Sequence, residues 1–331
     1  MDFRTHVAVK EFNIRISHSD TIMLLGSCFA DEIGTRFIEN KFNASVNPFG
    51  VLYNPLSIAV ALKRLISGEA YSEQELFVDG NLYHSFQHHS TFSDTDPMRM
   101  LSVMNSYLAR ASQMLKSAKF LFLTFGTAWV YELVTTGVVV SNCHKLPASD
   151  FLRRRASMEE MIELWMELIP LLININPNIK VLVTVSPVRH LRDGAHENTL
   201  SKSELLLFCD RLQQKFRERI LYFPAYEIVL DELRDYRFYC EDMTHPSEQA
   251  VSYVWERLSE VAFDDETKGL IAEWQKIRRR LLHRQLTCDK GGYLAFLQQT
   301  VEKLNEFALK YNSPDLSLER SRIEVMIKNI E

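Results

Sequence analysis

Hydrophobic residues follow two alternating patterns along this chain. Short apolar runs bounded by turn residues predict buried strands, and between them apolar residues recur every three to four positions, as in amphipathic helices. The expected strands lie at 21–26, from 119, at 179–187 and within 219–233. The expected helices lie at 28–39, 56–67, 98–117, 156–174, 201–218 and 247–262. Strands that alternate with long helices favour βαβ units, so the pattern predicts an α/β fold with a mainly parallel sheet covered by helices on both faces.

Three segments fall outside this alternation. Residues 77–92 contain an Asp-Gly-Asn sequence between β-type residues, which predicts a hairpin, and residues 132–140 resemble a second one. Residues 45–55 carry two Asn-Pro steps and a glycine, and they are predicted to form a loop.

The pattern changes near residue 264. Helical spacing continues from there, breaks at a Gly-Gly pair and resumes at 293–311. We therefore expect two parts, an α/β domain over residues 1–262 and a C-terminal helical extension over residues 263–331 that packs on it.

Composition narrows the class of protein. Apolar residues make up 46% of the 331 residues and charged residues 24%, as in globular proteins, and the net charge of -5 gives no electrostatic case for binding nucleic acid. The arginine runs 153–155 and 278–280 lie beside helical patterns, and we interpret them as solvated faces. No apolar run reaches the ~18 to 20 residues of a membrane span, so no membrane-spanning segment is expected.

Two further features bear on the cellular compartment. The N-terminal segment carries charges throughout and has no apolar core of a secretory signal. The five cysteines include no Cys-x-x-Cys pair, so neither a disulfide framework nor a zinc ribbon is expected. Both observations favour a cytoplasmic protein.

Candidate chemistry gathers directly after the predicted strands. Ligands of open parallel sheets bind at the carboxyl ends of the strands. In chain order, the small or polar residues that follow the four strands are Ser27, Gly126-Thr127, Ser186-Pro187, and the pair Asp242 and His245. We expect these residues to share one edge of the sheet.

Ser27 and the Asp242-x-x-His245 sequence suit nucleophilic catalysis. A serine at a helix N-terminus lies at the positive end of the helix dipole, and it needs a base to become a nucleophile. Asp-x-x-His in one loop lets the carboxylate fix the imidazole tautomer, and Pro246 stiffens that loop. Ser27 is then the nucleophile, His245 the base and acid, and Asp242 the group that orients it. Each feature alone also has a structural interpretation, an N-cap for Ser27 and a surface loop for the pair, but together they favour catalysis.

Cys28 is a second candidate nucleophile. A thiol at the start of a helix can have a lowered pKa, or it can pack as a small apolar residue. Neighbouring helix positions differ by ~100° in direction, so only one of Ser27 and Cys28 can face His245.

Two groups of residues are candidates for contacts to substrate. His84, His88 and His89 lie close in sequence, but no carboxylate stands at ligand spacing, so a metal site is not expected. Contacts to a polar substrate and a solvated surface are the two interpretations of this group. Arg189 and His190 follow the third strand, where they either meet an anionic or hydroxyl-rich substrate or have a structural role.

Five blocks of this sequence resemble the GSCFA family. In order over roughly residues 20 to 260, they are Gly26-Ser27-Cys28-Phe29-Ala30, Asn47-Pro48-Phe49-Gly50, Phe125-Gly126-Thr127-Ala128-Trp129-Val130-Tyr131, Thr184-Val185-Ser186-Pro187-Val188 and Asp242-Met243-Thr244-His245-Pro246. That family is similar to the SGNH (GDSL-like) hydrolases. The resemblance implies a flavodoxin-like three-layer α/β/α sandwich.

The resemblance also implies roles for individual residues. It favours Ser27 as the nucleophile, with Cys28 packed under the helix, and it gives Gly50 the position of an oxyanion-hole N–H. SGNH enzymes generally have Gly-x-Asn-Asp in the third block, whereas residues 126–129 here read Gly-Thr-Ala-Trp. The backbone N–H groups of Ser27 and Gly50, with the hydroxyl of Thr127 in place of the asparagine, are the expected oxyanion hole. Loss of one such donor typically costs on the order of 10² to 10³ in rate.

The resemblance implies a serine esterase that removes a small acyl group, such as acetyl, from a carbohydrate or other hydroxylated carrier without a cofactor. The possible substrate contacts are Asn47, His88, His89, Trp129, Arg189 and His190. One alternative is an acyltransferase that uses the same acyl-enzyme, shielded from water by the C-terminal helices and by Trp129 and Tyr131. Another is a glycan-binding module of little activity, suggested by the missing asparagine. The expected partner is a small-molecule or glycan ester, and the sequence carries no signal for an oligomeric state.

Overall fold

A five-stranded parallel sheet forms the centre of the molecule. The computed structural model describes residues 4–283, 289–311 and 315–330. The strands of this sheet are β1 (Thr21–Gly26), β2 (Asn43–Val46), β5 (Phe120–Phe125), β9 (Lys180–Val185) and β10 (Ile220–Tyr222). Their order is β10-β9-β5-β1-β2, and every neighbouring pair is parallel. Counted along the chain, this is the flavodoxin-like order 2-1-3-4-5. The predicted α/β/α fold with a parallel sheet is therefore confirmed.

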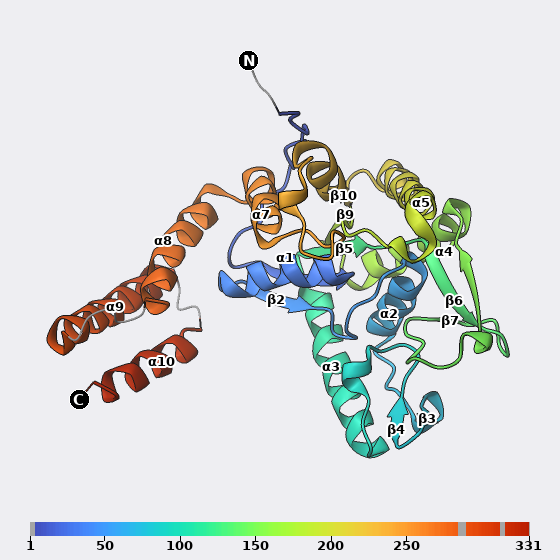
Figure 1. Cartoon of the computed structure of the whole chain (residues 1–331), viewed down its shortest axis with the longest axis horizontal. Helices are drawn as coiled ribbons and strands as arrows, with labels where there is room; N and C mark the ends of the chain where they lie inside the picture. Colours follow the sequence, from blue (N-terminus) through green and yellow to red (C-terminus); the bar gives the residue numbers. More distant parts are fainter. Residues whose placement is uncertain (1–3, 284–288, 312–314, 331) are drawn as a thin grey trace.

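Side chains of β1 alternate between two hydrophobic cores, one on each face of the sheet. Met23 and Leu25 belong to the larger core, while Ile22 and Leu24 belong to the smaller one. The larger core is covered by α2 (Pro55–Ser67), α3 (Pro97–Ser117), α4 (Met158–Ile175) and α5 (Gly194–Lys215). The smaller is covered by α1 (Cys28–Glu39) and α7 (Glu248–Ala262), both labelled in Figure 1, and by the short α6 (Ala225–Glu227) and the π-helical turn Ile228–Glu232.

Strand β2 lies at an edge of the sheet, and the sequence did not predict it. Its four residues pair with β1 from Thr21↔Asn43 to Leu24↔Val46. The predicted loop 45–55 therefore begins inside a strand. The sequence pattern does not indicate this strand, because its residues are exposed or half-buried at the sheet edge and therefore include no run of apolar residues.

Two small antiparallel units lie outside the main sheet. The predicted hairpins correspond to β3 (Phe77–Asp79) with β4 (Leu82–His84), and to β6 (Trp129–Leu133) with β7 (Val139–Val140). A further strand, β8 (Phe151–Arg155), pairs with the other side of β6. The interpretation of arginines 153–155 as a solvated face beside a helix is wrong, because they lie half-buried on β8 and form ion pairs. The pairs are Arg153–Asp193, Arg154–Glu132, Arg154–Glu160 and Arg155–Glu197.

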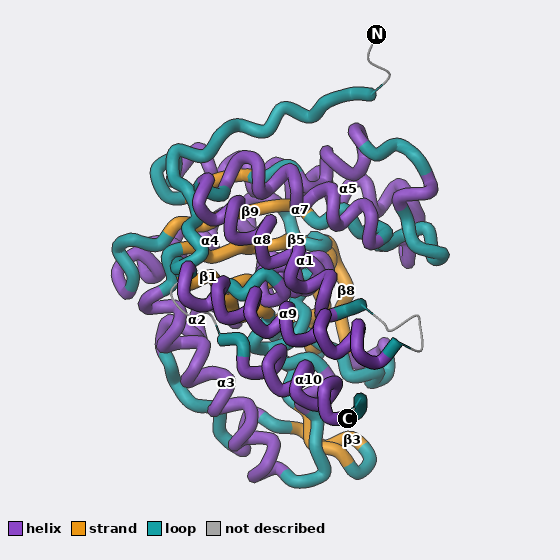
Figure 2. Tube along the Cα trace, turned by 90° about the vertical axis from the view of Figure 1, so that its left-hand side faces the viewer, coloured by secondary structure: helices purple, strands orange, loops and turns teal. Residues whose placement is uncertain are grey.

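The C-terminal helices are α8 (Asp265–Leu281), α9 (Lys290–Lys310) and α10 (Ser317–Lys328). They share a third hydrophobic core, which includes Trp274, Phe307 and Ile323. Figure 1 shows these helices as an arm beyond α1 and α7, and Figure 2 views the molecule from that side. The indole N–H of Trp274 donates to the Glu39 carbonyl at the end of α1 (2.6 Å), and Lys41 pairs with Glu319 (2.6 Å).

Two details of the arm differ from the predictions. Helix α10 was not predicted, and the Gly-Gly pair does not break a helix. Gly291 and Gly292 lie in the first turn of α9, where the carboxylate of Asp289 accepts a hydrogen bond from the Gly292 N–H (2.9 Å). No helix in the described part of the chain combines the length and apolar character needed to cross a membrane.

Candidate active site

The turn from β1 into α1 requires a glycine at its first position. Gly26 has φ of +150°, and a Cβ there would lie 2.3 Å from the Thr124 carbonyl oxygen on the neighbouring strand. The Gly26 N–H donates to Asn47 Oδ1 (2.8 Å), and Asn47 Nδ2 donates to Asp31 (2.5 Å). Asn47 thus holds the end of β1 in place and does not line the cavity described below.

Ser27 is the N-cap residue of α1, but its side chain makes no capping hydrogen bond. The residue is fully buried, and its Oγ has no hydrogen-bond partner among the described residues. A buried hydroxyl that caps nothing is costly to retain, because it loses its hydrogen bonds to water without replacement. The simple N-cap interpretation of Ser27 therefore does not account for this serine.

Asp242 and His245 form a hydrogen-bonded pair in the loop before α7. Asp242 Oδ2 lies 2.6 Å from His245 Nδ1, and Oδ1 accepts from the backbone N–H groups of Thr244 and His245 (2.9 Å each). These hydrogen bonds hold the pKa of Asp242 well below its usual value, with the backbone N–H groups making the larger contribution and the imidazole a smaller one. A carboxylate accepts hydrogen bonds only, so the Nδ1 of His245 carries the proton and Nε2 is left as the basic nitrogen. Met243, between the two, has φ of +58°, which closes the loop tightly.

A cavity of about 320 Å³ opens beside His245 at the carboxyl ends of the strands. Predicted residues that line it are Thr127, Trp129, Arg189, His190 and His245, together with Cys28. Ser27 does not line the cavity, but it lies close to a residue that does: a Cβ on Gly126 would be 3.1 Å from Ser27 Cβ and 3.3 Å from His190 Nε2. The structure thus brings Ser27, His190 and His245 to the same edge of the sheet, as the strand ends predict.

Arginines and aromatic rings form the far wall of this cavity. The Arg153 guanidinium stacks 4.2 Å from the centre of the Trp129 ring and pairs with Asp193. Arg192 donates to the Tyr131 hydroxyl (2.5 Å). Sequence reasoning missed Arg153 and Arg192, because their contribution depends on β8 and on the turn after β9 folding over the site.

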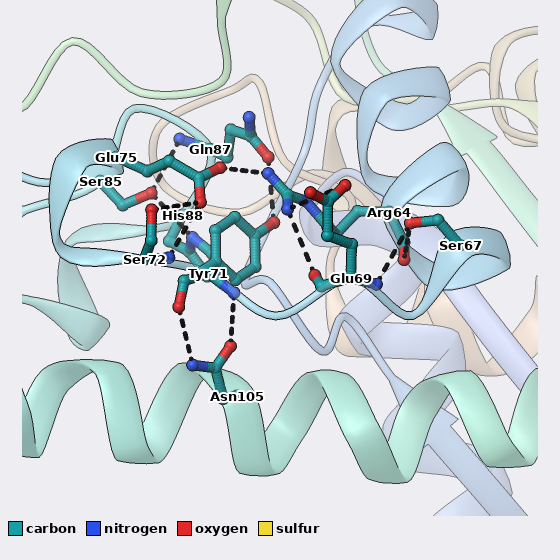
Figure 3. A network of polar contacts seen from close by, with 10 residues as sticks. All are labelled: Arg64, Ser67, Glu69, Tyr71, Ser72, Glu75, Ser85, Gln87, His88 and Asn105. Carbon is teal, nitrogen blue, oxygen red and sulfur yellow. Dashed lines mark hydrogen bonds and ion pairs between the residues drawn. The ribbon is translucent and has the colours of Figure 1, made fainter.

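His88 and His89 do not line this cavity. His88 is buried in the polar network of Figure 3, where its Nδ1 lies 3.0 Å from Ser85 Oγ and burial lowers its pKa to about 3. Tyr71 lies beside it, and the Arg64 guanidinium carbon stacks 4.2 Å from the centre of the Tyr71 ring (Figure 3). The backbone of His89 lies beside that of Phe49: the His89 N–H donates to the Phe49 carbonyl oxygen (2.9 Å). Among the described residues, no three His, Cys, Asp or Glu side chains are arranged to hold a metal ion.

The three predicted oxyanion donors are all engaged by other protein groups. The Ser27 N–H donates to the Thr124 carbonyl (3.1 Å), and the Gly50 N–H donates to the Asn47 carbonyl (2.7 Å). The Thr127 hydroxyl is hydrogen-bonded to Ser201 Oγ (3.0 Å). The two backbone N–H groups therefore present no unused donor to the cavity in this structure, while in the Thr127–Ser201 pair either hydroxyl can be the donor.

Cys28 lies half-buried at the cavity wall and also contacts the smaller hydrophobic core. Burial raises the pKa of its thiol above the usual value. A helix N-terminus can lower a cysteine pKa, but here burial has the larger effect. Cys28 is therefore mainly a thiol at neutral pH, which disfavours it as the nucleophile.

Lys202 is a fully buried lysine that sequence reasoning missed. It lies in α5, and its Nζ donates to the carbonyl oxygens of Gly126 (2.6 Å) and Ser186 (2.7 Å). It thereby joins the ends of β5 and β9 beneath the site. Its position on the same helix face as the buried Leu205 and Cys209 was a signal of burial in the sequence.

Replacing Lys202 with methionine is expected to change how stability depends on pH. An unfolded lysine has a pKa of about 10.4, whereas burial lowers the pKa of Lys202 to about 7. Between these values the unfolded chain binds more protons, so this group makes wild-type stability rise with pH by at most about 1.4 kcal/mol per pH unit. The Lys202→Met variant lacks this contribution.

Urea unfolding of both proteins across that pH range measures the difference. Lys215→Met, which removes an exposed lysine from the same helix, is the matched control and should follow the wild type. Parallel stability curves for wild type and Lys202→Met would contradict the prediction.

An open parallel sheet of flavodoxin-like order, with a cavity at the carboxyl ends of its strands, defines the class of α/β/α sandwich proteins. Within this class, residues 21–258 match the GSCFA family and residues 274–329 match the GSCFA domain protein, C-terminal domain. The chain belongs to the GSCFA family.

A search of curated proteins found no match. The chain is similar to an acetyl xylan esterase (Est2A) from the rumen bacterium Butyrivibrio proteoclasticus, with 9% sequence identity and a TM-score of 0.29. That similarity covers 74% of this chain and 65% of the esterase chain.

Proposed function

We propose that this protein is a serine esterase in which His245 activates Ser27 and Asp242 orients His245. The observation that carries the proposal is the 2.6 Å contact between Asp242 Oδ2 and His245 Nδ1, at the sheet edge where Ser27 Oγ is buried with no partner in the described part of the chain. A paired imidazole and an unused hydroxyl are the two components of an activated serine.

The proposed reaction proceeds through an acyl-enzyme. His245 Nε2 accepts the Ser27 proton while Oγ attacks the ester carbonyl, and His245⁺ then protonates the departing alcohol. Water hydrolyses the acyl-enzyme by the reverse sequence of proton transfers. In the present structure Ser27 Oγ has no hydrogen bond to His245; such contacts often become short only when the substrate is bound.

The lining of the cavity supports a small acyl group on a hydroxylated carrier. Trp129 and Tyr131 are aromatic residues of the kind that pack against sugar rings, here beside the Arg153 guanidinium that stacks on Trp129. Arg189 and Arg192 offer hydrogen-bond donors to hydroxyl or anionic groups. A volume of about 320 Å³ is near the lower end of the range for ligand pockets. We therefore propose acetyl, or an acyl group of similar size, as the group removed.

Incubation of the wild-type protein with 4-nitrophenyl acetate tests the proposal. We expect release of 4-nitrophenolate above the rate in buffer, with one acetate formed per nitrophenolate. Repeating the assay with added sugar acceptors identifies transfer, since acetyl sugar would then replace acetate. The C-terminal helices do not shield the cavity, because no described residue of α8, α9 or α10 lines it. They therefore give no support to the acyltransferase alternative. A protein that hydrolyses and transfers nothing but binds a glycan would contradict the esterase proposal.

A further inference from the structure

An ester hydrolase of this type needs a hydrogen-bond donor for the oxygen that becomes negative in the tetrahedral intermediate. The third sequence block has no asparagine for this task. The Ser27 and Gly50 N–H groups and the Thr127 hydroxyl are already bonded to protein atoms. Another hydrogen-bond donor near Ser27 would supply what the sequence block without an asparagine lacks.

His190 is the candidate, because one nitrogen of its ring is buried close to Ser27. Its backbone N–H donates to Asn198 Oδ1 (2.9 Å), and its ring lies edge-on to Tyr53 with the ring centres 5.8 Å apart, so the residue is held on two sides. Its Nε2 is buried and has no partner among the described residues. A buried imidazole nitrogen without a partner is rare, because it loses its hydrogen bond to water.

The position of this nitrogen relative to Ser27 follows from Gly126. A Cβ at residue 126 would lie 3.3 Å from His190 Nε2 and 3.1 Å from Ser27 Cβ. The nitrogen and the serine therefore flank one point above the Gly126 backbone. The Tyr53 carbonyl oxygen lies 3.2 Å from the same point, so the space is narrow and a side chain at residue 126 would crowd all three groups. Ser27 Oγ is likewise buried without a partner among the described residues.

We propose that His190 is a catalytic residue whose Nε2–H donates a hydrogen bond to the substrate carbonyl oxygen as it becomes an oxyanion. This inference rests on the proposed esterase function. As Ser27 Oγ bonds to the carbonyl carbon, the π electron pair moves onto that oxygen and the serine proton moves to His245. His190 gains and loses no proton in the step. It fills the role for which the sequence offers no asparagine.

The charge state of His190 suits this role and does not suit a base. Burial lowers the pKa of His190 to about 4, with smaller contributions from Lys202 and His245. At neutral pH the ring is neutral, and a neutral imidazole still has one N–H to donate. A base with so low a pKa would accept the serine proton poorly, and, in the described part of the chain, no carboxylate is hydrogen-bonded to His190 as Asp242 is to His245.

Replacement of His190 by alanine and by glutamine tests the assignment. For His190→Ala we expect kcat on 4-nitrophenyl acetate to fall by about 10² to 10³ with KM changed little, as for loss of one oxyanion donor. His190→Gln, which retains a side-chain N–H, should recover part of that loss. His196→Gln removes an exposed histidine six residues further along and should leave kcat unchanged. Unfolding curves check that each variant is folded. If His190→Ala does not fold, the kinetics of His190→Gln test the assignment.

A transition-state mimic separates catalysis from structure. An aryl boronic acid forms a tetrahedral adduct with an activated serine, so its affinity should fall in proportion to kcat/KM in the His190 variants. Unchanged kcat in folded His190→Ala would overturn the inference. A loss of about 10⁵ or more that also abolishes labelling of Ser27 would instead identify His190 as the base. If the wild-type protein hydrolyses no ester, the esterase proposal itself fails, and this outcome is distinct because it appears before any variant is made.

Discussion

Replacing Ser27 with alanine is expected to lower kcat for 4-nitrophenyl acetate by about 10⁵ to 10⁶, the scale on which loss of a catalytic serine acts in serine hydrolases. Ser27 Oγ is the atom that would form the acyl-enzyme, so the variant has no route through that intermediate. Steady-state kinetics measures the effect, with KM remaining near that of the wild type because the cavity wall is unchanged. Folding should be preserved, since the Ser27 side chain makes no hydrogen bond to a described residue.

Cys28→Ala is the informative comparison for this variant. Cys28, one residue further along the chain, lines the cavity, but burial raises the pKa of its thiol and keeps it protonated. The loss of activity should therefore be far smaller than in Ser27→Ala. The reverse order, with Ser27→Ala active and Cys28→Ala inactive, would identify the thiol as the nucleophile and contradict the account.

Replacing His245 with alanine is expected to abolish turnover of the same ester to a similar extent, because no other group would take the serine proton. Asp242→Asn should cost about 10⁴ in kcat, since an amide can favour the wrong imidazole tautomer while leaving the loop folded. Both variants are measured by steady-state kinetics on the aryl ester.

Glu241→Gln is the matched control for these two variants. It removes an exposed carboxylate next to Asp242 without touching the 2.6 Å contact to His245, so its activity should equal that of the wild type. Wild-type turnover by His245→Ala would exclude the proposed triad. Equal losses in Glu241→Gln and Asp242→Asn would show that charge on the loop matters and that orientation of the imidazole does not.

Local patterns in the sequence predicted the parts of the fold that are buried and continuous. The apolar run of β1 and the amphipathic spacing of α1 identified both elements, and the alternation of strands and helices identified the parallel sheet. The strands that were missed, β2 and β8, lie at sheet edges. Half-buried edge residues leave no apolar run, so their pairing depends on partners distant in sequence.

The candidate site divides in the same way. Asp242 and His245 stand three residues apart in one loop, so their contact could be predicted from spacing. The helix face of Lys202 was a signal of its burial, but its hydrogen-bond partners are carbonyl groups 76 and 16 residues away in the chain, which no local pattern predicts. His88 was predicted as a substrate contact because it stands beside other histidines in the sequence. In the structure its loop places the side chain in a separate, buried polar network, where it contacts Ser85.

Labelling with a fluorophosphonate, followed by intact mass and peptide mapping, tests the central claim most directly. Such probes form a stable bond only with a serine whose proton is removed by a neighbouring base. The account predicts a single adduct on Ser27 in the wild-type protein and none in His245→Ala. An adduct that persists in His245→Ala, or a protein in which Ser27 stays unlabelled while Cys28 reacts with a thiol-selective probe, would contradict it.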